Sequence, residues 1–138
     1  MEKILIDTDV ILDFFFDRSP FSDDASRILA LCEKRKINGF VTPVMISNVY
    51  YLLRKTASHE KVIENIRALL GIIDVVAIHR ETILDAMNSN FKDFEDALQN
   101  FAAQSHKGIK VIITRNIKDY KTSKLSIMSP ETYLQTIR

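Results

Sequence analysis

The sequence predicts an α/β fold, a three-layer α/β/α sandwich around a central, mainly parallel sheet of four to five short strands. Short apolar runs alternate along the chain with longer stretches whose apolar residues recur at helical spacing. This alternation is typical of a parallel sheet that carries helices on both faces. The chain has 138 residues, which suits one such domain and is short for two, so we expect a single domain over residues 1–138.

The expected strands are short apolar runs. The first, Lys-Ile-Leu-Ile at residues 3–6, ends at Asp7. An uninterrupted apolar run of this kind is typical of a strand that is buried on both faces. Similar runs predict strands at residues 39–42, 74–78 and 111–113, with a short edge strand at 127–128.

The expected helices lie between these strands. Pro20 and Pro43 suit the first turn of a helix, where a missing backbone donor costs nothing. The helix that begins at Ser19-Pro20 is expected to end at the basic residues 34–36, which favour a carboxyl end. Further amphipathic stretches predict helices at residues 58–70, 81–88 and 93–106.

Composition excludes several classes of protein. Hydrophobic residues make up 46% of the chain and charged residues 27%, a balance that excludes intrinsic disorder. The chain has one cysteine, Cys32, and no signal peptide or membrane-spanning run, so we expect a soluble, cytoplasmic protein without a disulfide. The net charge of +1 neither supports nor excludes a nucleic-acid partner, because an acidic metal site offsets basic residues elsewhere.

Polar residues follow the first and fourth expected strands. Asp7 ends the first strand and Asp9 lies two residues further on. Thr114, Asn116 and Asp119 follow the fourth strand. Because ligands of open parallel sheets bind beyond the carboxyl ends of the strands, we expect these side chains to lie close together.

Two more acids, Asp93 and Asp96, lie three residues apart near the start of an expected helix and therefore point to one side of it. Glu95 is expected to project away from them into solvent. Helix capping is the alternative role for Asp7 and Asp93, and a favourable helix-dipole charge is the alternative for Asp96. Gathered acids need a cation, most naturally Mg²⁺ or Mn²⁺, and such an ion can activate water against a phosphodiester.

Three blocks of the sequence resemble conserved blocks of PIN domains. Residues 4–13, Ile-Leu-Ile-Asp-Thr-Asp-Val-Ile-Leu-Asp, resemble the opening block, in which a strand ends in Asp-Thr-Asn/Asp-Val. Residues 93–98, Asp-Phe-Glu-Asp-Ala-Leu, resemble the third block, and residues 114–120, Thr-Arg-Asn-Ile-Lys-Asp-Tyr, resemble the closing block. The order, the spacing and the chain length fit, so the resemblance covers essentially the whole chain.

The resemblance implies a PIN fold whose acidic cluster binds Mg²⁺ or Mn²⁺ and hydrolyses RNA as an endoribonuclease. Small stand-alone members of this kind are typically VapC-like toxins of prokaryotic toxin–antitoxin pairs. The resemblance therefore also implies a cognate antitoxin as partner, a homodimer and no association with membranes.

Positions in the family motifs imply individual roles. Asp7 corresponds to the first metal ligand and Asp96 to the third. The fourth position falls on Asn116, with Asp119 nearby as an alternative carboxylate. The hydroxyl of Thr114 is expected to hold the site or a bound water, and Arg115, beside the site, to contact the substrate phosphate.

The second position departs from the family pattern. PIN domains usually place a glutamate in the helix after the second strand, where this chain has Asn48. An amide oxygen can bind a metal, but it carries no charge and cannot act as a base. We therefore expect Asp93 and Asp119 to supply the missing charge, with Asp9 as a further supporting carboxylate.

Two other functions fit parts of the sequence. Because amides occupy two usually acidic positions, the fold could serve as an RNA-binding or protein-interaction module with little hydrolysis. Phosphotransferases of the haloacid-dehalogenase kind also begin with Asp-x-Asp after a buried strand, with the first Asp as nucleophile. They need a later lysine and a further acidic pair, usually in a longer chain.

Overall fold

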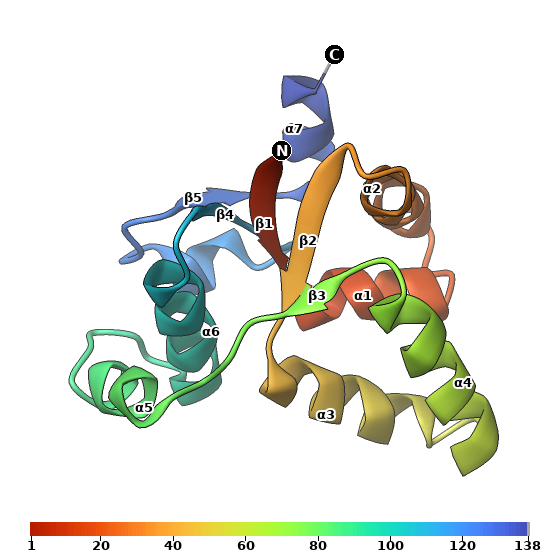
Figure 1. Cartoon of the computed structure of the whole chain (residues 1–138), viewed down its shortest axis with the longest axis horizontal. Helices are drawn as coiled ribbons and strands as arrows, with labels where there is room; N and C mark the ends of the chain where they lie inside the picture. Colours follow the sequence, from red (N-terminus) through yellow and green to blue (C-terminus); the bar gives the residue numbers. More distant parts are fainter. Residues whose placement is uncertain (138) are drawn as a thin grey trace.

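The computed structural model describes residues 1–137, within which the strands form one five-stranded parallel sheet of order β3-β2-β1-β4-β5 (Figure 1). The predicted α/β class and the short parallel strands are confirmed. The strands are β1 (Glu2–Ile6), β2 (Ile37–Val41), β3 (Asp74–Val75), β4 (Ile109–Ile113) and β5 (Ser126–Met128).

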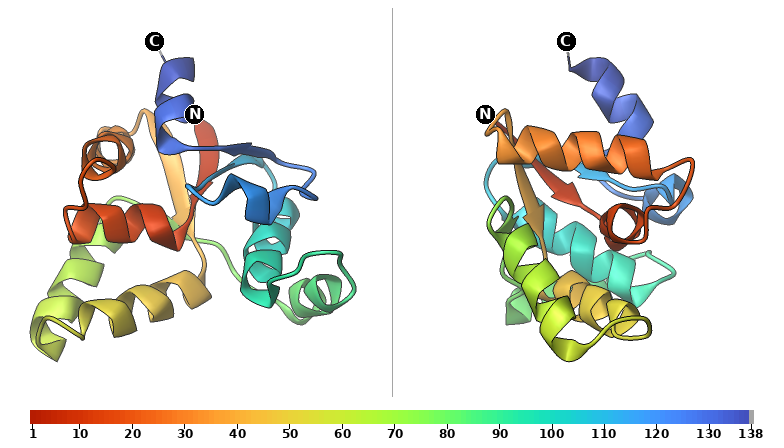
Figure 2. Two further views of the ribbon diagram at one scale, coloured as in Figure 1. Left: turned by 180° about the vertical axis from the view of Figure 1, so that it is seen from behind. Right: turned by 90° about the vertical axis from the view of Figure 1, so that its right-hand side faces the viewer.

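Helices cover both faces of this sheet, as Figures 1 and 2 show. The chain steps from β1 outward to β2 and β3 and then crosses back to β4. Because such crossovers are right-handed, the reversal places the later helices on the opposite face. The first face carries α1 (Thr8–Phe15), α2 (Ser22–Glu33), α3 (Pro43–Leu53), α4 (His59–Leu70) and, against α2, α7 (Pro130–Thr136). The second carries α5 (Arg80–Met87), α6 (Phe94–Ser105) and the 3₁₀ helix η1 (Ile117–Tyr120).

The central strands are buried on both faces, as their apolar runs predict. Ile4, Leu5 and Ile6 of β1 are all fully buried, and so are Ile112 and Ile113 of β4. The edge strand β3 differs from the prediction. Only two residues of the expected 74–78 strand belong to it, because β3 pairs with the last two residues of β2 alone. Both of these residues are exposed.

One helix prediction needs correction, and two helices were not predicted. The helix expected from Ser19-Pro20 begins at Ser22 and ends at Glu33, before the basic residues. The helices α1 and α7 were not predicted, although Ser129 and Pro130 give α7 the same cap and first-turn proline that Thr42 and Pro43 give α3. Cys32 is buried and without a disulfide in the described chain, as expected. Within residues 1–137, no helix is long and apolar enough to cross a membrane.

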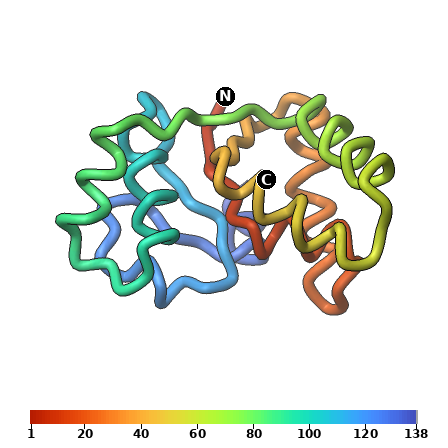
Figure 3. The backbone as a smooth tube through the Cα atoms, turned by 90° about the horizontal axis from the view of Figure 1, so that it is seen from below, coloured from red at the N-terminus to blue at the C-terminus, as the bar shows by residue number. Residues whose placement is uncertain are grey.

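The sheet topology creates one special position, the carboxyl end of β1. The chain leaves the neighbouring strand β2 toward the first face, whereas β4 receives the chain from the second face. Helices on the two faces therefore diverge beyond β1, and Figure 3 shows this end of the molecule, with α5 and α6 on one side and α3 and α4 on the other. Such a switch point is where open α/β sheets bind ligands.

Candidate active site

A cavity of about 390 Å³ opens at this switch point, between α1 and α3 on one side and α6 on the other. Asp7, at the end of strand β1, contributes the first carboxylate of the cavity, and Glu95 and Asp96 of α6 contribute two more from the opposite layer. The cavity is lined by Asp7, Asp9, Arg18, Asn48, Glu95, Asp96, Gln99 and Asn116, together with apolar neighbours. The structure thus brings together the acids of two sequence blocks about ninety residues apart, as Asp7 and Asp96 show.

Asp7 is the most firmly held acid of the cavity. It caps α1, with Oδ1 accepting a hydrogen bond of 2.8 Å from the backbone N–H of Thr8. Its Oδ2 accepts from the hydroxyl of Thr114 at 2.9 Å and from the hydroxyl of Tyr120 at 3.3 Å. Burial raises the pKa of Asp7 in spite of these donors. Thr114 therefore holds the first acid, a role that the sequence suggested, and Tyr120 adds a donor that sequence reasoning missed.

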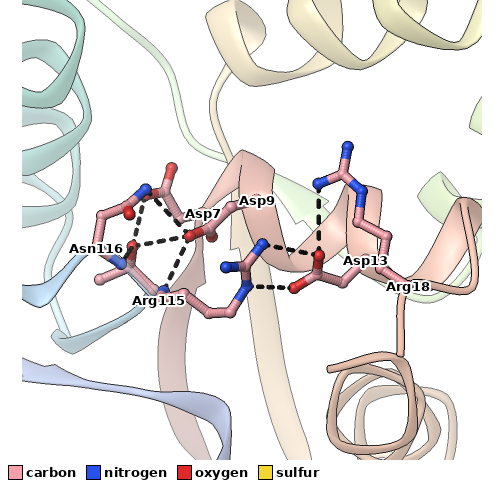
Figure 4. Close-up of polar contacts among 7 residues, drawn as sticks. Asp7, Asp9, Asp13, Arg18, Arg115 and Asn116 are labelled. Carbon is pink, nitrogen blue, oxygen red and sulfur yellow. Dashed lines mark hydrogen bonds and ion pairs between the residues drawn. The ribbon is translucent and has the colours of Figure 1, made fainter. Parts of the chain in front are cut away.

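Asp9 lies beside Asp7 and is tied to the closing block of the sequence (Figure 4). Its Oδ2 accepts from the backbone N–H of Arg115 at 2.9 Å and from the side-chain amide of Asn116 at 3.3 Å. Burial, followed by the charge of Asp7, raises the pKa of Asp9 to about 6. Its Oδ1 is buried and has no hydrogen-bond partner within residues 1–137.

Helix α6 presents Asp96 and Glu95 to the same cavity. Burial and then the charge of Asp93 raise the pKa of Asp96 to about 7, and Asp7, Asp119 and Glu95 add to this. The expectation that Glu95 projects into solvent is wrong, because it accepts a hydrogen bond from the amide of Asn48 across the cavity. Consecutive helical residues lie only about 100° apart, so both carboxylates fit on the face of α6 that overlooks the cavity.

Asp93 and Asp119 lie in a neighbouring cavity of about 240 Å³, and Asp96 lines both cavities. Asp93 caps α6, with Oδ1 accepting from the backbone N–H of Asp96 at 2.9 Å. The structure thus places the expected compensating acids next to Asp96, but not in the cavity that holds Asp7.

The side chain of Arg115, expected to contact the substrate phosphate, does not line the cavity of Asp7 and Asp96. Its guanidinium binds the buried Asp13 (Figure 4), with Nε 2.6 Å from Oδ2 and Nη2 3.0 Å from Oδ1. The guanidinium carbon also lies 3.9 Å from the ring centre of Phe21. Arg18 is the arginine that lines the active-site cavity, and its Nη1 lies 3.5 Å from Asp13. The signal that could have revealed Asp13 is its position, directly after the apolar residues 10–12.

Comparison with known proteins identifies the family. Residues 3–118 match the family model described as PIN domain. The chain belongs to the PIN-domain family. This PIN domain is 28% identical over 142 aligned residues to Ribonuclease VapC1 of Aquifex aeolicus (strain VF5), covering 97% of the chain and 94% of that protein. The resemblance found in the three sequence blocks is thereby confirmed.

Solved structures of bacterial complexes share the fold of this PIN domain. A toxin–antitoxin complex from Klebsiella pneumoniae has a chain that is 20% identical, with a TM-score of 0.69 and coverage of 92% of this chain and 97% of that one. VapBC-1 from nontypeable Haemophilus influenzae has a chain that is 16% identical, with a TM-score of 0.68 and coverage of 94% and 98%. At these identities the likeness establishes the fold alone.

The donors of this PIN-domain cavity fit a hard divalent cation. Carboxylate and amide oxygens are the ligands that Mg²⁺ and Mn²⁺ prefer. The unpartnered Oδ1 of Asp9 and the mutual repulsion that raises the pKa of Asp96 both favour a positive charge nearby. Within residues 1–137, no three side chains of His, Cys, Asp or Glu converge on one point. The acids therefore share a cavity without forming a closed cage.

Proposed function

We propose that this protein, a single PIN domain over residues 1–138, is an endoribonuclease that uses Mg²⁺ or Mn²⁺ to hydrolyse RNA phosphodiester bonds. The observation that carries the proposal is the shared cavity, in which Asp7 and Asp9 of the first block meet Glu95 and Asp96 of α6 at the switch point of the sheet. Membership of the family and similarity to Ribonuclease VapC1 support it.

Each polar residue of the cavity has a proposed role. Asp7 and Asp96 would hold the cation, with Asn116 and Asp9 as supporting oxygen ligands. When bound, the cation supplies activation of water and stabilisation of the leaving oxygen. Thr114 keeps Asp7 in one orientation through its 2.9 Å hydrogen bond.

The substrate phosphate needs a cationic partner, and Arg18 is the best-placed group. It lines the cavity and makes one long contact of 3.5 Å with Asp13, whereas Arg115 makes two shorter contacts with Asp13 and does not line the cavity. A guanidinium can donate two parallel hydrogen bonds to a phosphate. We propose that Arg115 acts through its backbone N–H, which orients Asp9.

Asp93 and Asp119 contribute charge from the neighbouring cavity. Both raise the pKa of Asp96, which supports an influence of their charges on this carboxylate. We propose that they strengthen cation binding in place of the acid that Asn116 replaces.

We further propose that the protein is the toxin of a toxin–antitoxin pair, acting in the cytoplasm as a homodimer. The structural neighbours that are toxin–antitoxin complexes support a protein partner. An apolar cavity of about 570 Å³ between α1, α2 and α4, lined by Phe14, Phe15 and Leu29, offers a surface on which a partner could bury apolar side chains.

The test is cleavage of a mixed RNA substrate by the purified protein with Mg²⁺, Mn²⁺ or EDTA. We expect cleavage that needs metal and falls by about 100-fold or more in Asp96→Asn, since loss of an anionic ligand weakens binding of the catalytic ion. The matched control is Asp85→Asn, at an exposed position of α5, which should leave cleavage unchanged. Metal-independent cleavage, or full activity of Asp96→Asn, would contradict the proposal.

A module that binds RNA or protein without hydrolysis is the second candidate. The observation that favours it is the failure of three acids to converge within the described chain. A folded wild-type protein that binds RNA but leaves it intact in every metal would support this candidate.

A further inference from the structure

We infer that Glu95 supplies the second acidic ligand of the site, carried on α6 instead of α3. The inference rests on the proposed metal-dependent function. The family pattern places a glutamate where this chain has Asn48, so α3 leaves the site one negative charge short. The structure provides that charge from the opposite side of the cavity.

The contact between Asn48 and Glu95 places the carboxylate where it is needed. Asn48 lies in α3 on one face of the sheet and Glu95 in α6 on the other. The amide Nδ2 of Asn48 donates to Oε1 of Glu95, so the carboxylate of Glu95 reaches the end of the side chain at position 48. Both residues line the cavity that Asp7 and Asp96 share.

The residue types on the two sides are complementary. A glutamate at position 48 would place a second negative charge against Glu95, whereas the amide of Asn48 donates a hydrogen bond to it. The pair therefore carries one negative charge, on Glu95, and one amide, on Asn48, that orients the carboxylate of Glu95. We assign metal binding to Glu95 and positioning of Glu95 to Asn48.

A purely local role for Glu95 does not account for its contacts. The cap of α6 is already provided by Asp93, which accepts from the backbone N–H of Asp96. Glu95 instead lines the cavity that Asp7 and Asp96 share, with its carboxylate held there by Asn48. A cation bound in this cavity would offset the negative charge of Glu95 and of the other carboxylates that line it.

Titration calorimetry with Mn²⁺ tests the assignment. We expect Glu95→Gln to weaken Mn²⁺ binding about tenfold or more, while the double variant Asn48→Glu/Glu95→Gln recovers to within about threefold of wild type by returning the carboxylate to α3. The control is Glu81→Gln, because Glu81 is the exposed second residue of α5 just as Glu95 is the second residue of α6. Glu81→Gln should bind Mn²⁺ as wild type does.

Parallel RNA cleavage and circular dichroism separate the outcomes. If wild type binds Mn²⁺ and cleaves RNA while a folded Glu95→Gln binds Mn²⁺ equally well, the role of Glu95 is overturned and the proposed function stands. If Glu95→Gln loses Mn²⁺ binding and the double variant does not regain it, a carboxylate at position 48 cannot replace the one at position 95. This result overturns the inference that Glu95 stands in for the glutamate of α3. A wild-type protein that neither binds Mn²⁺ nor cleaves RNA overturns both proposals.

Discussion

At the residue scale, Asp13 shows how an ion pair outside the cavity orders a group inside it. Its side chain is 1% exposed and binds the guanidinium of Arg115 through two hydrogen bonds of 2.6 and 3.0 Å. The backbone N–H of Arg115 in turn donates to Asp9 in the cavity. Asp13 and Arg115 thus anchor the segment after β4 to α1.

Asp13→Asn should destabilise the protein by about 3 kcal/mol, because it leaves a partly buried guanidinium without its counter-ion. Urea unfolding of wild type and variant measures the change. The control is Asp24→Asn on α2, whose partner Arg27 lies 3.7 Å away with a side chain that is 67% exposed. Such a surface pair contributes at most about 1 kcal/mol. Equal losses in both variants would refute the anchoring role of Asp13.

The sequence could place the residues of the site, but it could not predict the direction of their long side chains. Asp7, Thr114 and Asn116 could be placed because each lies at the end of a buried strand. The directions of Glu95 and Arg115 depend on partners distant in sequence, Asn48 and Asp13. A long side chain with several rotamers goes where its partner is, and local spacing does not reveal that partner.

At the scale of elements, the packing of α2 on β2 depends on a glycine. A Cβ atom added to Gly39 would lie 2.7 Å from Sγ of Cys32 and 3.0 Å from Cδ1 of Ile6. Both neighbours are buried in the core. The close approach of helix to strand therefore requires the absence of a side chain at position 39.

Gly39→Ala should lower the free energy of unfolding by about 1–3 kcal/mol through overpacking. Adding Cys32→Ala removes the nearest atom, so the double variant should be less destabilised than the sum of the two single variants. Gly71→Ala, at an exposed position with φ −74°, is the control and should change stability by about 0.5 kcal/mol or less. Chemical denaturation of the four variants decides the matter, and strict additivity would count against the proposed clash.

Strands in the buried centre of the sheet could be predicted from the sequence, whereas the edge strand β3 and the short helix α1 could not be predicted as well. The runs in β1 and β4 could be assigned because both faces of these strands are covered. The strand β3 is fixed by two residues of β2 and not by its own pattern. The helix α1 has only eight residues and follows β1 directly, so its apolar residues span little more than two helical turns and give a weak periodic pattern.

At the scale of the whole molecule, the topology concentrates negative charge at one place. The reversal of strand order brings acids from both helical layers to the carboxyl end of β1. Burial and mutual repulsion raise the pKa of Asp9 to about 6 and that of Asp96 to about 7. Without a cation, the ionised cavity is therefore a source of instability.

Stability in EDTA should fall as the pH rises from about 4 to about 7, since the folded protein holds protons on Asp9 and Asp96 that the unfolded chain has released. Saturating Mg²⁺ should stabilise the protein more at pH 8 than at pH 5, because the metal binds the ionised carboxylates. Thermal unfolding across this range measures both effects. Asp96→Asn should flatten the decline in EDTA. Equal slopes for wild type and Asp96→Asn would exclude this carboxylate as a source of the decline.

Anomalous diffraction from crystals soaked in Mn²⁺ tests directly whether the cavity at the switch point is a metal-dependent active site. We expect a manganese peak bonded to the carboxylates of Asp7 and Asp96, within the cavity that Asn48 and Glu95 also line. The same soak of Asp96→Asn should lose this peak. A manganese ion bound only beside Asp93 and Asp119, or none in the main cavity at saturating Mn²⁺, would contradict the account.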